Sequence, residues 1–268
     1  MIYKYYSLTS YNLDALKVGY FYFSKAKYLN DPFDTSFKLV SQSIVNRFFP
    51  KEPYKTKGSK SMANYGICSF SEQWDNNILW AYYADNYKGF VVGYDEKVFT
   101  KIMENYLVRI PFQKVHYIKN LECIYNQKCF PYYSLGNEEG VDAKFEECQM
   151  PSLGTQINIK ALDKFFTYLC AVKSSLWQSE KEWRLIAAKD VICREYSAII
   201  KEDTGYKIPM PQGCIKEIII GFNFDKKHSG DINEIMVRHN LSDVYCIQTA
   251  QSPFGLEKVK YNLNKLIL

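Results

Sequence analysis

The sequence predicts an α+β fold with a mixed or antiparallel central sheet and inserted helices. Strand-like apolar segments alternate along the chain with segments of helical periodicity. Aromatic residues make up 16% of the chain, with 23 Tyr and 17 Phe, and aromatic side chains favour strands. No long linker and no internal repeat interrupts the 268 residues. We therefore expect a single domain over residues 1–268, with a mainly helical insertion at about 120–175.

Each predicted element of the first quarter has a local signal. The β-favouring segments 2–6 and 20–24 flank a helix, for which Ser10 is the candidate N-cap and Gly19 the terminator. Residues 30–34, Asn-Asp-Pro-Phe-Asp, form a turn because Pro fixes the backbone and Asn and Asp favour turns.

The remaining elements continue the alternation. Residues 37–49 have helical character up to Pro50, and the polar, lysine-rich residues 51–64 indicate a loop. Further strands are expected at 65–70, 89–94, 114–118, 182–187, 215–220 and 244–249, and further helices at 76–83 and 231–240. This gives about eight strands and five helices.

Composition and charge indicate a soluble, cytoplasmic protein. The net charge of +5 suits an anionic ligand but is too diffuse to indicate nucleic-acid binding. The eight cysteines include no CxxC pair, so we expect them to be unpaired and free of metal. The N-terminus lacks signal-peptide features, and no apolar run approaches the roughly 20 residues of a membrane helix. The glycine motifs of P-loop ATPases, Rossmann dehydrogenases and α/β-hydrolases are also missing.

The segment 177–187 gathers two acids, two tryptophans and an arginine before an apolar stretch. In a strand, successive side chains alternate between faces, so Glu180, Glu182 and Arg184 share one face. A charged start and an apolar continuation suit a catalytic cleft, and they also suit a sheet edge that is charged against aggregation. We predict that the three charged side chains point into one concave site, shared with Ser69 or Ser71.

Four short motifs occur in a fixed order along the chain. They are the turn at 30–34, Cys-Ser-Phe-Ser at 68–71, Trp-Ala-Tyr-Tyr-Ala at 80–84 with Gly-Phe at 89–90, and Trp-Gln-Ser-Glu-Lys-Glu-Trp-Arg at 177–184. In these motifs the chain resembles a bacterial family known as domain of unknown function 2971. Members of that family often carry His where this chain has Tyr82, and tyrosine as a residue type is a poor proton carrier at neutral pH.

The segment Glu180-Lys181-Glu182 also resembles the E-x-E strand of ADP-ribosyltransferases. The resemblance implies a split sheet of that type and NAD as the substrate. It implies that Glu182 is catalytic, holding a ribose hydroxyl and stabilising the sugar cation as nicotinamide leaves. It implies that Glu180 orients or deprotonates the acceptor.

The same resemblance implies NAD-binding residues around the two glutamates. Ser69 or Ser71 matches the serine strand of those enzymes. Tyr82 and Tyr83 are candidates to stack on nicotinamide, and at most one of them lines a cleft because they face different sides of a helix. Basic residues that can meet the pyrophosphate are Lys4, Lys173 and Arg184.

Three functions remain open from the sequence. The first is an NAD-dependent ADP-ribosyltransferase in toxin or phage-defence biology, which needs no metal and modifies a protein or nucleic acid. The second is a metal-dependent nuclease, whose acids and lysine would be Asp31, Asp34, Glu180, Glu182 and Lys173. The third is a non-enzymatic module that binds nucleic acid or protein. We further expect Glu182→Gln to abolish activity with little loss of thermal stability, as for a cleft carboxylate that contributes little to the core.

Overall fold

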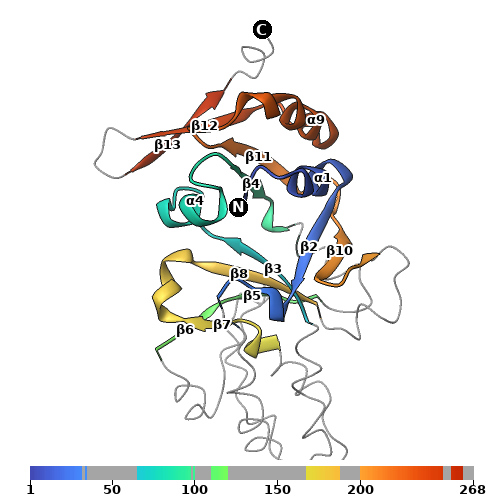
Figure 1. The fold of residues 1–268 in the computed structure, drawn as a ribbon, viewed down its shortest axis with the longest axis vertical. Helices are drawn as coiled ribbons and strands as arrows, with labels where there is room; N and C mark the ends of the chain where they lie inside the picture. The colour runs from blue at the N-terminus through green and yellow to red at the C-terminus, as the bar shows by residue number, and fades with distance from the viewer. Residues whose placement is uncertain are drawn as a thin grey trace, which may run out of the picture.

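The computed structural model describes residues 1–31, 34, 65–97, 99, 110–119, 167–187, 200–249 and 255–261. In this part of the chain, helices and a mixed, mostly antiparallel sheet form the α+β fold that the sequence predicts (Figure 1). The expected helix at 37–49, the loop at 51–64 and most of the helical insertion at about 120–175 lie outside the described residues. No described helix has the length and apolar character needed to span a membrane.

The main sheet follows the order β13-β12-β11-β4-β1-β3-β2-β10-β9, and β8 joins β5 to β3. β11 runs parallel to β12, and the other strand pairs of this sheet in the described chain are antiparallel. Its members are β1 (Ile2–Tyr6), β2 (Tyr20–Lys25), β3 (Gly66–Ser71), β4 (Phe90–Tyr94), β5 (Phe112–Lys114), β8 (Glu182–Ala187), β9 (Ile200–Lys201), β10 (Gly205–Pro209), β11 (Ile215–Ile220), β12 (Val244–Thr249) and β13 (Leu256–Tyr261).

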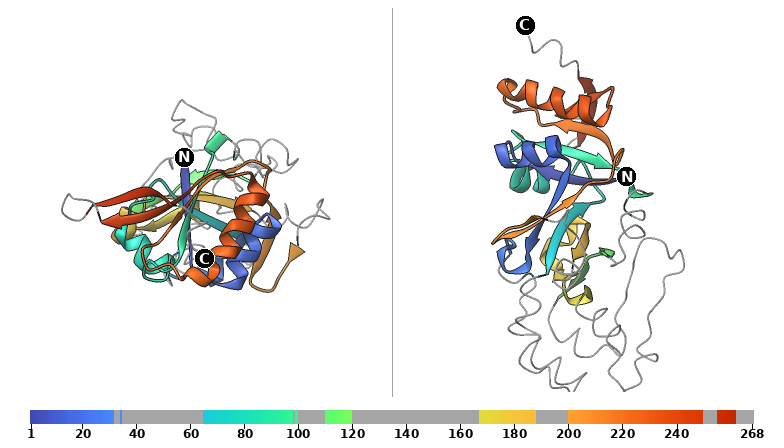
Figure 2. Two further views of the ribbon diagram at one scale, coloured as in Figure 1. Left: turned by 90° about the horizontal axis from the view of Figure 1, so that it is seen from above. Right: turned by 90° about the vertical axis from the view of Figure 1, so that its right-hand side faces the viewer.

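β1 and β3 are neighbours in one sheet, but they have the shortest pairing in it, and we call this place the split between β1 and β3. β1 pairs with β4 along its whole length, but it meets β3 through one bridge, Tyr3 opposite Ser71. The other end of β3 pairs with β2 through Gly66 and Ile67. Among the described strands, none pairs with residues 68–70 on that side. Figures 1 and 2 show β4 and β11 separating from β3 and β8.

Three α-helices of the described chain pack on the sheet. α1 (Ser10–Val18) is capped by Thr9, whose hydroxyl accepts the N–H of Asn12. The N-cap is thus one residue earlier than expected, because Thr9 keeps an extended backbone while Ser10 is already helical. Gly19 ends the helix with φ 87°. α4 (Asn77–Tyr83) begins after the cap Asn76, and α9 (Ser229–His239) lies beside α1.

α4 ends in an unusual left-handed turn. Asp85, Asn86 and Tyr87 all have positive φ, which is rare for residues with side chains. The turn contacts the residue after β11, where a Cβ on Gly221 would lie 1.8 Å from the carbonyl oxygen of Tyr87. This contact therefore requires glycine at position 221.

Two hydrophobic clusters flank the sheet. The larger one packs Leu13 and Leu16 of α1 and Ile235 of α9 against aromatic strand residues such as Phe21 and Phe70. On the other face, Trp80 of α4 packs with Tyr3, Val91 and Ile219. The two clusters hold α1 and α4 at the split between β1 and β3.

The expected strand at 114–118 is two strands in different sheets. β5 pairs with β8, whereas β6 (His116–Ile118) pairs in parallel with β7 (Val172–Ser174). The change occurs at Val115, whose N–H donates to the carbonyl of Glu182. Four strands were not expected from the sequence, namely β7, β9, β10 and β13. They are short or carry lysines among their apolar residues, so their periodicity is weak.

Candidate functional site

A cleft of about 280 Å³ opens where β1 and β3 separate. Tyrosines from β1, α1, β2 and α4 line its walls, together with Lys4, Ser69 and Ser71. At one end the lining changes to the charged residues Asp34, Lys173, Glu180 and Glu182. The cleft therefore combines aromatic walls with a charged end.

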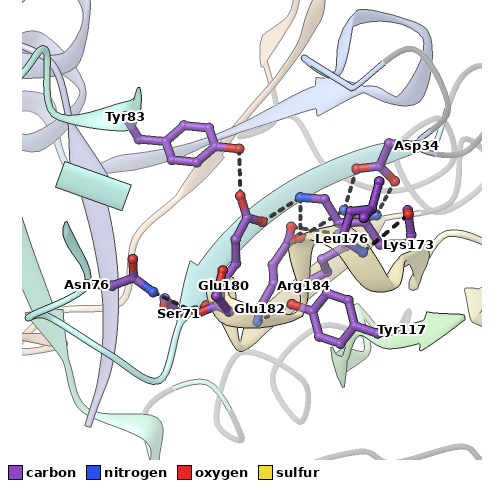
Figure 3. A network of polar contacts seen from close by, with 12 residues as sticks. Asp34, Ser71, Asn76, Tyr83, Tyr117, Lys173, Leu176, Glu180, Glu182 and Arg184 are labelled. Carbon is purple, nitrogen blue, oxygen red and sulfur yellow. Dashed lines mark hydrogen bonds and ion pairs between the residues drawn. The ribbon is translucent and has the colours of Figure 1, made fainter. Parts of the chain in front are cut away.

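Five charged side chains form a buried cluster at that end (Figure 3). They are Asp34, Lys173, Glu180, Glu182 and Arg184, each no more than 7% exposed. Three acids and two bases give a formal charge of −1. Buried charges persist only when they are paired and hydrogen-bonded, and here each acid has a basic partner.

Arg184 holds two acids from behind the cleft. Its Nε and Nη2 donate to the two carboxylate oxygens of Glu182 at 2.8 and 3.0 Å. Its Nη1 and Nη2 donate to Asp34 at 2.9 and 2.6 Å, and Nη1 also donates to the carbonyl of Cys170 at 2.7 Å. Arg184 is 1% exposed and is not among the residues that line the cleft, contrary to the expectation that it faces a ligand. It fixes Glu182 and Asp34 instead.

Lys173 lies between the two glutamates. Its Nζ is 2.5 Å from Oε2 of Glu180 and 3.1 Å from Oε2 of Glu182. The ammonium also lies 5.2 Å from the centre of the Trp177 ring. Burial would lower the pKa of Lys173, but the carboxylates of Glu182 and Glu180 raise it above its ordinary value. Lys173 is therefore a charged partner of both acids.

Glu180 reaches the cluster from outside the strand. It is the last residue of a 3-10 helix, η4 (Ser175–Glu180), and Lys181 follows in the left-handed conformation before β8 begins at Glu182. The expectation that strand alternation aligns Glu180 with Glu182 is therefore wrong. The turn at Lys181 brings the two carboxylates to the same lysine, and the hydroxyl of Ser71 donates to the carbonyl of Glu180 at 2.7 Å.

The two glutamates have opposite pKa shifts. Burial raises the pKa of Glu180 above its ordinary value, and the nearby charge of Glu182 adds to the effect. Lys173 and a hydrogen bond of 3.0 Å from Tyr83 act against that rise without cancelling it. Burial would also raise the pKa of Glu182, but Arg184 and Lys173 outweigh it and lower that pKa. Glu182 is therefore the more firmly ionised carboxylate.

The remaining expected residues divide between the cleft and the surface. The ammonium of Lys4 crosses the split and donates to the carbonyl of Ser69 at 3.0 Å. Tyr83 lines the cleft, whereas Tyr82 is 70% exposed and contacts the edge of Trp177. A helix presents consecutive residues to different sides, so one tyrosine of the pair reaches the site.

Two contacts of the cluster have weak or no sequence signal. Asp34 belongs to a motif that also suits a simple turn. The backbone N–H of Asp34 donates to the carbonyl of Asp31, as in a turn. Its pairing with Arg184 spans 150 positions and cannot be read locally. The hydroxyl of Tyr117 accepts the N–H of Glu182 at 2.8 Å, and no motif marks this residue.

The acids of the site are arranged around protein cations. Within the described ranges, no three His, Cys, Asp or Glu side chains are grouped to hold a metal ion. Asp34, Glu180 and Glu182 share Lys173 and Arg184 as partners. Cys68, Cys214 and Cys246 are free thiols, and four of the eight cysteines lie outside the described residues.

The fold and the cluster together define an α+β protein with a buried acid–base network at the end of a cleft. Residues 79–185 match the model of a family described as "Protein of unknown function (DUF2971)". The matched segment contains Tyr83, Lys173, both glutamates and Arg184. Over this segment, the match supports the family resemblance that the motifs indicate. Neither the curated proteins nor the solved structures contain a match to the chain.

Proposed function

We propose that the protein is an NAD-dependent ADP-ribosyltransferase-like enzyme with Glu182 as its catalytic carboxylate. The observation that carries the proposal is the pair of carboxylates, Glu180 and Glu182, at the end of a tyrosine-lined cleft in a split sheet. This arrangement supplies fixed negative charge beside surfaces that suit planar rings.

The chemistry of NAD cleavage requires charge stabilisation more than acid–base strength. As the bond between the ribose and nicotinamide breaks, its electron pair leaves with nicotinamide and the sugar becomes cationic. A carboxylate that is held in place stabilises that cation without reorganisation. Arg184 and Lys173 hold Glu182 ionised and oriented, since both bond to it directly.

The walls of the cleft supply groups for the rest of NAD. Tyr83 lines the cleft beside Glu180 and is the candidate to stack on nicotinamide. Lys4 lies at the split between β1 and β3 and is the cation available to the pyrophosphate. Ser69 and Ser71 line the same wall, in the position of a serine strand.

Glu180 would orient or deprotonate the acceptor, which we propose to be a protein or a nucleic acid. A carboxylate whose pKa is raised by burial is suited to take up a proton. The biological setting that we propose is toxin or phage-defence activity in the cytoplasm. Free thiols at Cys68, Cys214 and Cys246 are compatible with such a reducing compartment.

The test is NAD turnover by wild type, Glu182→Gln and a matched control, Glu217→Gln. Glu217 is also a buried carboxylate paired with a lysine, Lys258 at 2.7 Å, but it does not line the cleft. We expect Glu182→Gln to lower nicotinamide release or ADP-ribose transfer on the order of 100-fold or more. Glu217→Gln should retain wild-type turnover.

The outcome also separates the rival functions. If calorimetry detects no NAD binding by wild type at millimolar ligand, the proposal is rejected. DNA or RNA cleavage that depends on magnesium or manganese would then support the nuclease. Binding of nucleic acid or protein without turnover would support a non-enzymatic module.

A further inference from the structure

Lys173 has a position in the cluster that no other described side chain shares. Its ammonium bonds to Glu180 at 2.5 Å and to Glu182 at 3.1 Å. Arg184, the other base, bonds to Glu182 and Asp34. Within the described chain, Lys173 is therefore the cation that links the two glutamates.

We propose that Lys173 is a positioning residue that bridges Glu180 and Glu182 and keeps Glu180 a proton-accepting carboxylate beside the constantly charged Glu182. The catalytic meaning of these roles rests on the proposed function. The titration order of the two acids does not, because it depends only on the contacts within the cluster.

The asymmetry follows from the number of cations around each acid. Glu182 accepts hydrogen bonds from Lys173 and from Nε and Nη2 of Arg184. Glu180 accepts hydrogen bonds from Lys173 and from the neutral hydroxyl of Tyr83. Two carboxylates that share one lysine repel each other, so the first proton binds the less well compensated acid. That acid is Glu180.

The surrounding elements do not reverse this order. β8 contributes Arg184 together with Glu182, and Asp34 occupies the far side of the same guanidinium. Tyr117 of β6 faces the backbone N–H of Glu182, and Tyr83 of α4 faces Glu180. Lys4 lies on the β1 wall of the cleft, bonded to a backbone carbonyl. Lys173 is thus the cation that lowers the proton affinity of Glu180.

The consequence for transfer concerns one proton. The acceptor nucleophile forms a bond to the ribose carbon that nicotinamide has left, and its proton passes to the Glu180 carboxylate. Without Lys173, a larger fraction of Glu180 would already hold a proton at a given pH and could not accept the proton of the nucleophile. Raising the pH would restore the carboxylate and with it the transfer step.

The direct test is carboxyl-carbon NMR of protein with isotope-labelled glutamate, in which Glu180→Gln assigns the Glu180 signal. In wild type we expect Glu180 to titrate above Glu182, and the reverse order would overturn the proposal. Lys173→Met removes the charge and keeps the chain length. It should raise the Glu180 midpoint by about one pH unit or more, as for removal of an opposite charge in contact.

Lys173→Arg is the control that keeps the positive charge but changes the shape of the side chain. We expect its Glu180 midpoint to stay near that of wild type, because the positive charge is retained. Equal midpoints in wild type and Lys173→Met would show that the lysine only fills space. If Lys173→Met does not fold, Lys173→Gln removes the same charge with a polar side chain, and its Glu180 midpoint decides the question.

A kinetic measurement connects the titration to the proposed reaction. The acid limb of the kcat profile for transfer should move to higher pH in Lys173→Met, with less than about a twofold change in KM for NAD. A loss of kcat that is equal at all pH values would contradict the role of Lys173. If wild type turns over no NAD, the proposed function fails, while the NMR titration still tests Lys173 independently.

Discussion

At the residue scale, Glu182 is a structural ion as well as a catalytic candidate. It is 5% exposed and bonds to two buried cations. A buried charge that loses its partner remains desolvated without compensation. The expectation from the sequence that replacing Glu182 leaves thermal stability unchanged therefore does not fit the burial of this residue.

We predict that Glu182→Gln lowers the free energy of unfolding by about 3 kcal/mol, as for the breaking of a buried ion pair. Glu217→Gln should cost about 1 kcal/mol or less, because its partner Lys258 is 29% exposed and water screens that pair. Denaturant unfolding of both variants measures the difference. Equal losses in the two variants would show that the Arg184 contacts add no stability.

At the element scale, the connection from α4 to β4 sets the position of Tyr83. Three successive left-handed residues, Asp85 to Tyr87, follow the helix. They bring the carbonyl of Tyr87 against Gly221, and the stacked rings of Trp80, Tyr87 and Phe222 cover the contact. Non-glycine residues with positive φ are strained, so the neighbouring contacts must hold them.

We predict that Gly221→Ala destabilises the protein by about 3 kcal/mol, because its Cβ would overlap a backbone carbonyl. Gly230→Ala is the matched control, since this glycine lies in α9 and its Cβ would meet nothing within 4 Å. That substitution should stabilise the protein by about 0.5–1 kcal/mol through helix propensity. Thermal melting of both variants tests the pair, and a neutral Gly221→Ala would mean that the turn moves freely.

At the scale of the whole molecule, the cluster links β7, η4 and β8 to Asp34, so its charge state contributes to global stability. Arg184 and Lys173 lower the pKa of Glu182 against the effect of burial. A carboxyl group with a lowered pKa stabilises the fold at pH values above the pKa of the unfolded chain. That contribution disappears as the pH falls toward the pKa of the folded state.

We predict that the stability difference between wild type and Glu182→Gln shrinks as the pH falls from about 5 toward 2. Glu180 has the opposite dependence, because its raised pKa favours the folded state at low pH, but this group is present in both proteins. Glu182→Gln also removes a charge that raises the Glu180 pKa, so the Glu180 contribution acts against the decrease, and a shrinking difference shows that the Glu182 contribution is the larger one. A difference in unfolding free energy that is constant with pH would contradict the lowered pKa.

The sequence by itself determined the local structure where short-range signals agree. Strands β1, β8, β11 and β12 have the predicted bounds, because apolar or aromatic residues make up most of each strand. The family resemblance also followed from four motifs, and its match covers residues 79–185. Local chemistry was enough for these features.

Only the tertiary structure decided how the site is assembled. The split between β1 and β3, the pairing of Asp34 with Arg184 and the contact of Tyr117 with Glu182 join residues far apart in the chain. Even the neighbours Glu180 and Glu182 meet through a left-handed residue that strand alternation does not predict. Sequence periodicity describes which way a side chain points within one element, whereas partners across elements depend on long-range packing and charge burial.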